Sequence, residues 1–402
     1  MNALAQVPPN WLLDTRQPGR LVPAGHAAPH TQERLCDDRL NLLLAVLTRV
    51  TDPRGRRGRV HPLPFVLALA ILAVTSGAKS SLEIAEWSAD LDLNVLRILG
   101  WRRWSGIPSR WTFDRVLAGI DDTELDQALS RWATPATTRA VAVDGKTMRA
   151  AATGQPSMPL TQVVAATGAD GRVLGQARVV GGNENAAALD LITRLGPERL
   201  FKAVLTADAK HTSAGFVAAA EVVGAFWLLP IKHNGPALRR KLAAMPWGQV
   251  RFGARSSQDA HGRRETRTLK VLALGQDESA GLLGAAQAIR VHRYRRRTGR
   301  RASRSTVYYL TSLPPHAADP VVLAELIRGH WGIENKLHYV RDTAFDEDRH
   351  RARMGNLAAI HAVLRNTALT LHRAAGAKQM KAALRAAGRH LGRVLEVLPV
   401  PS

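Results

Sequence analysis

Three isolated acidic residues could together build a metal site. Asp144 follows the apolar run 140–143 and precedes Gly145, and Asp208 follows the largely apolar run 203–207. Glu334 lies in a stretch of helical character. Mg²⁺ takes oxygen ligands such as carboxylates, and two ions about 4 Å apart can activate a water or a 3′-hydroxyl and stabilise the leaving oxygen. The three residues therefore predict metal-dependent chemistry on a phosphate ester.

The net charge indicates the class of substrate. Lys and Arg number 56 against 33 Asp and Glu, which gives a formal charge of +23. The electrostatic field of such a positive charge attracts a polyanion. The alternative is that the charge only keeps the protein soluble. Together with the carboxylates, the charge predicts chemistry on nucleic-acid phosphates.

Composition argues against several other classes of protein. Cys36 is the only cysteine, so an intramolecular disulfide and a cysteine zinc site are excluded. The first thirty residues lack the apolar core of a signal peptide, and the longest apolar stretch, 65–74, is far shorter than the ~20 residues that span a bilayer. We expect a cytoplasmic, nucleoid-associated protein with no membrane role and no small-molecule cofactor.

The elements that must position these residues begin with an all-helical segment. After an irregular segment, 1–37, helices are indicated across residues 38–135, one of them opened by a capping box at Ser80 to Glu83. A basic loop in this segment is either a solvated linker or a phosphate grip, and it carries Arg54, Arg56, Arg57 and Arg59. Aromatic side chains here are interpreted as core rather than as base-stacking platforms, and they are Trp87, Trp101, Trp104, Trp111 and Trp132.

Strand patterns replace helical ones after Pro135 and predict the first part of a catalytic core over 138–233. Strands are indicated at 140–143, 162–166, 173–180, 203–207 and 225–231, with helices at 184–195 and 214–223. This order predicts an α/β fold with a sheet of mixed direction. If the strands before Asp144 and Asp208 are parallel neighbours, both carboxylates face one crevice, and Gly145 leaves room there for a metal or a phosphate.

The rest of the chain is predicted to contain a β-rich insertion and a helical end. Residues 234–315 carry the insertion, with strands at 263–273, 288–294 and 305–311. The basic run 293–304, which includes Arg295 and Arg296, should be a mobile loop unless it meets phosphates. Residues 316–402 carry the helix of Glu334 and two C-terminal helices, at 356–374 and 379–395.

Helical spacing places His330, Glu334 and His338 on one face, with Arg341 nearby. We expect these cations to hold DNA phosphate beside the metals. A transition-metal site and a solvated polar face are the alternatives, and the absence of a His-Glu-x-x-His motif argues against a metalloprotease. The acidic cluster that follows could be a second metal site or a set of partners for nearby arginines, and it comprises Asp342, Asp346, Glu347 and Asp348.

Four motifs resemble those of the DDE transposases of bacterial insertion sequences, and most closely the H-repeat-associated branch. They are VAVDGKTMR at 141–149, TADAKHT at 206–212, HGRRETR at 261–267 and RGHWGIENKLH at 328–338. The resemblance extends over about residues 40–370. It implies an RNase H-like core with Asp144, Asp208 and Glu334 as a triad that binds Mg²⁺, or Mn²⁺ as a substitute. It also implies that the N-terminal helical domain is associated with DNA binding.

The resemblance implies a transposase that cleaves insertion-sequence ends and joins a 3′-hydroxyl to target DNA. Its partners would be terminal repeats, target DNA and further copies of itself in a synaptic complex. Lys146, Arg328, His330 and Arg341 are then expected to bind DNA, Arg341 by contacting a phosphate near the cut. A stand-alone metal-dependent nuclease and an inactive, domesticated DNA-binding copy are the alternatives.

The sequence departs from the family pattern at several positions. The wider class often carries Tyr, Arg, Glu and Lys where this chain has Ile327, His330, Glu334 and Arg341. Within the branch, Gln often stands in place of Ser213, and Lys-Gly-Asn-Gln in place of residues 232–235. The triad itself is intact.

Overall fold

The structure, a computed structural model, describes residues 29–134, 138–148, 162–233, 235–260, 263–275, 283–297, 301–350 and 352–400. The described residues divide into two compact units. Unit 1 takes its residues from 137–143 and 192–331, and unit 2 takes its residues from 23–136, 144–191 and 332–402. Each unit is therefore built from segments far apart in the sequence.

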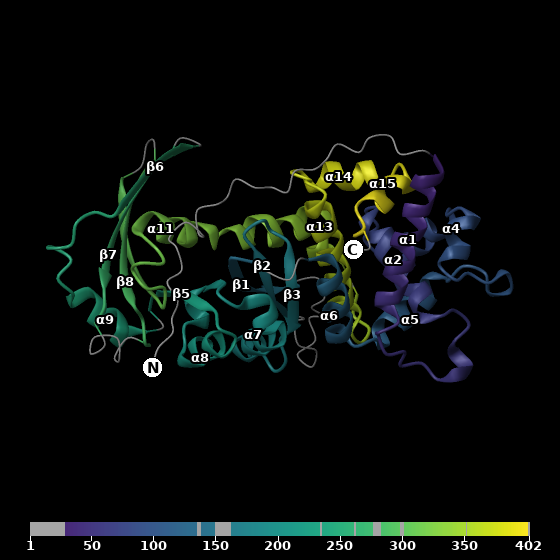
Figure 1. Ribbon diagram of the computed structural model, residues 1–402, viewed down its shortest axis with the longest axis horizontal. Coiled ribbons are helices and arrows are strands. Elements are labelled where there is room, and N and C mark those ends of the chain that lie inside the picture. Colours follow the sequence, from purple (N-terminus) through teal and green to yellow (C-terminus); the bar gives the residue numbers. More distant parts are fainter. Residues whose placement is uncertain are drawn as a thin grey trace. The chain divides into compact units, whose positions relative to one another are not determined.

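The described strands form one mixed sheet in the order β3-β2-β1-β4-β5-β9-β8-β7-β6 (Figure 1). Strand β1 (Ala140–Thr147) pairs in parallel with β4 (Val204–Ala207), and β4 pairs in parallel with β5 (Phe226–Ile231). Strands β2 (Gln162–Gly168) and β3 (Val173–Arg178) form an antiparallel hairpin. A hairpin followed by three parallel strands is the RNase H-like order, so the predicted fold class is confirmed.

The predicted β-rich insertion continues this sheet within unit 1. Strand β9 (Ser303–Thr311) is antiparallel to β5, and it is followed by β8 (Gln287–Arg297), β7 (Arg263–Ala273) and β6 (Ala254–Ala260). The basic run 293–304 that was predicted to be a loop lies on β8 at residues 293–297 and on β9 at residues 303–304, so that prediction is wrong for these residues. Strand β8 tolerates these charges because Glu265 of β7 lies opposite Arg295 and pairs with it at 3.2 Å. Residues 298–300 lie outside the described residues.

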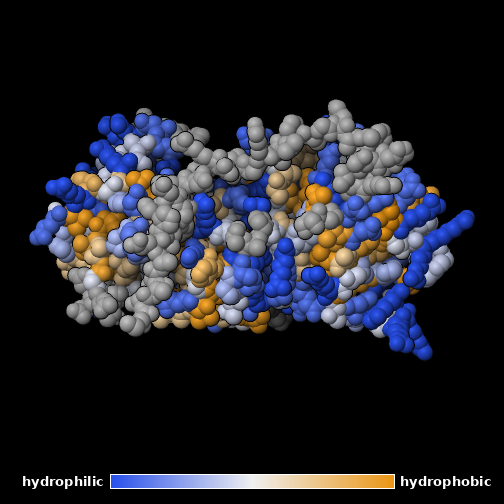
Figure 2. Space-filling model, in the orientation of Figure 1, coloured by the Kyte–Doolittle hydropathy of each residue, from blue (hydrophilic) through white to orange (hydrophobic). Residues whose placement is uncertain are grey.

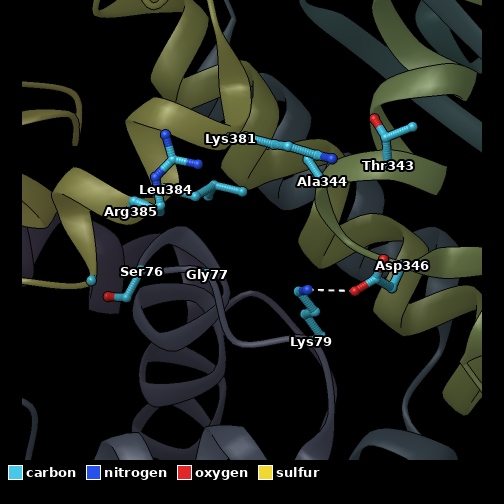
Figure 3. Close-up of a pocket in the computed structure, with 10 residues that line it drawn as sticks. Ser76, Gly77, Lys79, Thr343, Ala344, Asp346, Lys381, Leu384 and Arg385 are labelled. Carbon is cyan, nitrogen blue, oxygen red and sulfur yellow. Dashed lines mark hydrogen bonds and ion pairs between the residues drawn. The ribbon is translucent and has the colours of Figure 1, made fainter.

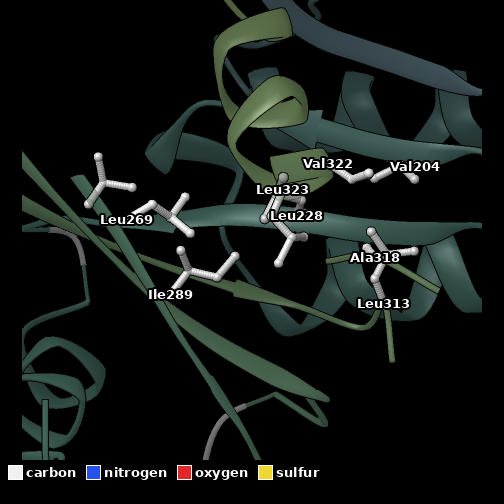
Figure 4. Packing of buried hydrophobic residues seen from close by; sticks show 9 residues of the cluster. Val204, Leu228, Leu269, Ile289, Leu313, Ala318, Val322 and Leu323 are labelled. Carbon is white, nitrogen blue, oxygen red and sulfur yellow. The ribbon is translucent and has the colours of Figure 1, made fainter. Parts of the chain in front are cut away.

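A hydrophobic core of unit 1 lies between the sheet and α11 (Pro320–Gly329) (Figure 4). Asp319 caps this helix, since its Oδ1 accepts hydrogen bonds from the backbone N–H groups of Val321 and Val322 at 2.9 Å. Burial of each large apolar side chain stabilises the fold by roughly 1.5–3 kcal/mol. The cluster comprises Val204, Leu228, Leu269, Ile289, Val291, Leu313, Ala318, Val322 and Leu323.

Three further helices accompany the strands. They are α7 (Glu184–Leu200), α8 (Ala214–Val222) and α9 (Pro236–Ala244). Helix α7 carries a kink at Gly196, whose φ of 68° lies in the left-handed region that glycine adopts without a steric cost. Helix α8 packs against β5 in unit 1.

Unit 2 contains the predicted helical segment, which begins earlier than predicted, because residues 29–37, expected to be irregular, belong to its first helix. Its helices are α1 (Pro29–Leu47), α2 (Leu63–Thr75), α3 (Ser81–Ala89), α4 (Leu93–Ile98), α5 (Arg110–Gly119) and α6 (Asp122–Ala133). Helix α2 is almost entirely apolar and buried, because α1, α3, α5 and α13 (Leu357–Ala374) pack around it (Figure 1). Half of the predicted capping box is present: Ser80 Oγ accepts from the Glu83 N–H at 3.3 Å, whereas the Glu83 carboxylate accepts from the Lys79 N–H at 3.0 Å.

The C-terminal part of unit 2 differs from the prediction of one helix over 379–395. The chain forms α12 (Tyr339–Ala344), α14 (Met380–Ala387) and α15 (Leu391–Glu396), so a break separates α14 from α15. A Cβ on residue 388 would lie 2.8 Å from the Ser76 carbonyl oxygen, so glycine allows close packing at this break. The predicted segment boundaries remain predictions, since the two compact units follow different divisions of the chain.

Two tryptophans predicted to lie in the core are exposed instead. Trp104 is 70% exposed and Trp111 is 62% exposed, and the guanidinium groups of Arg102 and Arg110 lie 5.9 and 5.1 Å from their respective ring centres. The core interpretation is therefore wrong for these two residues. Figure 2 shows hydrophilic residues over much of the visible face, with hydrophobic residues in separate patches. No helix among the described residues is long and apolar enough to cross a membrane.

Candidate active site

Asp144 lies on β1, one residue beyond the last position that pairs with β4. Its side chain is 20% exposed, and its Oδ2 lies 3.7 Å from Nδ1 of His338. Burial, reinforced by the charges of Arg341 and Lys146, lowers the pKa of His338 to about 3. The imidazole is therefore neutral at pH 7 and can serve as a metal ligand, but it does not attract phosphate by charge.

A carboxylate that the sequence analysis did not select approaches Asp144. Glu184, the first residue of α7, is buried, and one of its oxygens lies within 4.8 Å of an oxygen of Asp144. Nε2 of Gln162 donates a hydrogen bond to Glu184 Oε2 at 2.5 Å, which orients the carboxylate. The sequence signal for Glu184 was only that of a helix start, because its approach to Asp144 depends on tertiary structure.

Glycine at position 145 makes this approach possible. A Cβ built on Gly145 would lie 2.5 Å from both Cδ and Oε1 of Glu184. The space that was predicted beside Gly145 is thus occupied by the carboxylate of Glu184, which can itself bind a metal ion. The carboxylates of Asp144 and Glu184 suit a hard divalent cation, because such ions take oxygen ligands.

Asp208 lies in unit 1, directly after β4. Its Oδ1 accepts a hydrogen bond from Lys232 Nζ at 2.9 Å, and half of its side chain is exposed. Burial raises the pKa of Asp208, but hydrogen bonds from Lys232 and the Ala209 N–H outweigh it and hold the pKa below its usual value. The carboxylate is therefore ionised at neutral pH, as a metal ligand must be.

His330, also in unit 1, is mostly buried. Its Nδ1 lies 3.1 Å from the hydroxyl oxygen of Thr206. Burial lowers the pKa of His330 to about 4, although the nearby Asp208 opposes the shift. The ring is neutral at pH 7, so it does not bring to DNA the positive charge that was predicted for it.

Glu334 begins a π-helical turn, Glu334–His338, in unit 2. The Tyr339 N–H donates to the Glu334 carbonyl oxygen, five residues back, and the Glu334 side chain is exposed. A turn of this kind accommodates an extra residue, which rotates the following positions by about 100° relative to a regular α-helix. The predicted shared face of Glu334 and Arg341 is lost for this reason.

Arg341 is completely buried rather than placed at the surface. Its Nε and Nη2 donate to Glu347 at 2.7–2.9 Å, and Arg365 Nη1 donates to the same carboxylate at 3.1 Å. Burial raises the pKa of Glu347, but the two guanidinium groups outweigh it and lower the pKa to about 2. The predicted phosphate contact of Arg341 is therefore not available in this structure, and the residue forms an internal ion pair.

The rest of the acidic cluster is also paired with cations, which favours the ion-pair interpretation over a second metal site. Asp346 accepts a hydrogen bond from Lys79. Lys146 Nζ lies 2.7 Å from an oxygen of Asp342 and 3.9 Å from one of Asp348, and only 10% of its side chain is exposed. Lys146, which was predicted to bind DNA, is thus already paired with Asp342, and Asp348 lies near the same ammonium group.

The predicted basic residues divide into paired and exposed groups. Arg54 is largely buried, and it donates to Asp52 at 2.9 Å and to the His61 carbonyl oxygen at 2.8 Å, so it organises its own loop. Arg295 pairs with Glu265. Arg59 is exposed, but it pairs with Asp52 at 3.4 Å and donates to the Arg54 carbonyl oxygen at 2.8 Å. The remaining side chains are exposed and able to meet phosphate, and they are Arg56, Arg57, Arg296 and Arg328.

Comparisons with known proteins cover most of the chain. A family model described as "Transposase DDE domain" matches residues 135–371, and one described as "DDE_Tnp_1-associated" matches residues 44–133. The "Putative transposase YncI" of Escherichia coli O157:H7 is 28% identical over 352 residues, which cover 82% of this chain and 87% of that protein. The "H repeat-associated putative transposase YhhI" of Escherichia coli K12 is 24% identical over 349 residues, which cover 83% of this chain and 90% of that protein.

One solved structure is similar to this protein over most of the length of both chains. The cryo-EM structure of the piggyBac transposase synaptic complex with hairpin DNA has a TM-score of 0.39 and 13% identity, with 92% of this chain and 82% of that chain covered.

Proposed function

We propose, from the premise that this chain belongs to the family of transposases with a DDE domain, that it nicks the ends of an insertion sequence and joins the freed 3′-hydroxyl to target DNA. Membership makes the chain a DNA-cleaving transposase that uses divalent metal ions. The strand register is the observation that best supports cleavage and joining. Val143 pairs with Ala207 on adjacent parallel strands, and an aspartate follows each of them.

Mg²⁺, or Mn²⁺ in its place, would be held by Asp144, Asp208 and Glu334, with Glu184 as an additional carboxylate. When bound, the ions activate the attacking oxygen and stabilise the leaving oxygen. Lys232 keeps the carboxyl group of Asp208 ionised, and Gln162 fixes the orientation of Glu184. These supporting contacts prepare the ligands before the metal arrives.

The DNA partners in this proposal are the terminal repeats and the target duplex. The exposed arginines supply the sequence-independent part of the affinity by displacing counterions from the phosphates. Self-association in a synaptic complex would bring two transposon ends together. A nucleoid location follows because DNA is the substrate.

A strand-transfer assay tests the proposal. A labelled duplex that carries the sequence flanking the gene is incubated with a supercoiled plasmid and Mg²⁺ or Mn²⁺, with EDTA as the control. We expect nicked ends and plasmid-joined products that both require metal. Cleavage without joining would favour the stand-alone nuclease, and binding without cleavage would favour the inactive DNA-binding copy.

A further inference from the structure

A basic pocket lies in unit 2, separate from the predicted metal ligands (Figure 3). Its volume is about 430 Å³. Three segments form its wall: the turn after α2, the end of α12, and α14. Helix α14, at residues 380–387, lies beyond both regions that match family models, whereas the other two segments of the wall lie within them.

Helix α14 brings two cations to the pocket at a fixed spacing. Lys381 and Arg385 are four residues apart, so they lie on one face about 6 Å apart along the helix axis. Both side chains are exposed, whereas Met380 and Leu384 of the same helix are buried. Packing of the apolar side therefore anchors the helix and directs its basic side outward. In Figure 3 the Lys381 side chain extends toward Ala344.

A third cation stands on the opposite wall together with a carboxylate. Lys79 Nζ donates a hydrogen bond directly to Asp346, which also lines the pocket (Figure 3). This hydrogen bond lowers the pKa of Asp346; burial opposes the shift, and the charges of Lys79, Arg349 and Lys381 add to it. Three cations against one carboxylate leave the lining with a net charge of +2. The pocket therefore suits an anion.

We propose that this pocket binds a phosphodiester group of DNA. The guanidinium of Arg385 can donate two hydrogen bonds to a phosphate, and Lys381 adds a point charge. The positive surface continues beyond the pocket through the exposed side chains of Lys378 and Arg389. A polymer that extends past the pocket would use this continuation, whereas a free phosphate would not. The inference rests on the proposed function only in taking DNA as the substrate.

The test measures DNA affinity without catalysis. Fluorescence anisotropy with a labelled 30-bp duplex is recorded in EDTA at several salt concentrations for the parent and for Lys381→Gln/Arg385→Gln. Each phosphate contact contributes about 0.9 to the slope of log affinity against log salt, so we expect the slope to become shallower by up to about 2. At ~100 mM salt this change corresponds to a loss of affinity of about tenfold or more.

The matched control is Arg239→Gln/Arg240→Gln, which removes two exposed positive charges from α9. An affinity loss at least fivefold greater in the pocket variant than in this control supports the proposal, and an equal or smaller loss overturns it. Asp346→Asn, which removes the competing carboxylate, should tighten DNA binding more than Asp90→Asn at an exposed site of the same unit. Thermal melting of each variant confirms that it is folded.

Two further outcomes separate the possible failures. Isothermal titration with pyrophosphate should give no saturable binding at micromolar concentrations. If pyrophosphate binds and the double variant loses this binding while keeping its DNA affinity, the ligand is a free phosphate and the proposal is overturned. If the parent protein itself does not bind DNA, the proposed function fails as well; if the parent binds and the pocket variant matches the control, only the pocket assignment fails.

Discussion

Val143 and Ala207 pair with each other on the parallel strands β1 and β4, and each is followed in the chain by an aspartate. Side chains alternate along a strand, so a slip of one residue would turn every side chain to the other face of the sheet. The register is held in place by apolar burial, since Val141, Val143, Leu205 and Ala207 are all buried. The hydrophobic pattern of the two strands therefore positions Asp144 and Asp208, although the side chains of both aspartates are charged.

Gly145→Ala should disturb both stability and metal binding. The added Cβ would lie 2.5 Å from the Glu184 carboxylate, so one of the two must move. We expect a loss of about 1–3 kcal/mol in the free energy of unfolding and weaker Mn²⁺ binding, measured by urea denaturation and calorimetry. Gly55→Ala is the control, because nothing lies within 4 Å of a Cβ there. Equal behaviour of the two variants would contradict the packing argument.

Glu184→Gln should weaken divalent-metal binding while the fold is kept. The amide preserves the shape of the side chain but removes the charge that lies within 4.8 Å of Asp144. A loss of ~10–100-fold in Mn²⁺ affinity is expected, the range typical of residues that support a metal site. Glu86→Gln, at an exposed position of the same unit, should leave the affinity unchanged. An unchanged affinity in Glu184→Gln would remove this residue from the site.

Arg341→Ala should destabilise the fold instead of acting selectively on cleavage. The substitution leaves Glu347 buried with only Arg365 as its charged partner among the described contacts. Breaking a buried pair of this kind costs about 3–5 kcal/mol, which urea denaturation will detect. Arg328→Ala, at an exposed position, is the comparison. Parent-like stability combined with slow cleavage would restore the phosphate role first predicted for Arg341.

Stability should decrease as the pH falls below about 6.5. The rings of His350 and His361 lie 4.3 Å apart, and burial lowers the pKa of His350 to about 3 and that of His361 well below 6.5. The unfolded chain therefore takes up protons in this range while the folded chain does not, which favours unfolding. The free energy of unfolding should be smaller at pH 5.5 than at pH 7.5. His350→Gln should reduce this difference, and His390→Gln, at an exposed histidine, should not.

Much of the catalytic core could be predicted because its signals are local. The apolar runs before Asp144 and Asp208 identify strands without tertiary information. Strand β6 was missed because ARSSQDA has no apolar alternation, and it is a strand through its pairing with β7. The division of the last helix at Gly388 likewise depends on a close approach to Ser76.

The candidate site was harder to predict where it depends on tertiary contacts. Glu184 looked like a helix start, and only folding brings it to Asp144. Arg341 was misplaced because a regular helix was assumed across residues 334–341, whereas the π-helical turn changes the face. Trp104 and Trp111 were assigned to the core by residue type, although each contacts an arginine at the surface.

The proposed metal triad is tested most directly by the single-turnover cleavage rate at saturating DNA for Asp144→Asn, Asp208→Asn and Glu334→Gln. If the three carboxylates hold the catalytic metal ions, each rate should fall by more than the ~10–100-fold that loss of a supporting residue costs. DNA affinity should stay close to that of the parent, because the basic surface is unchanged. Asp259→Asn, at an exposed position on β6, controls for the substitution itself. A parent-like cleavage rate in any of the three variants would contradict the assignment of that residue.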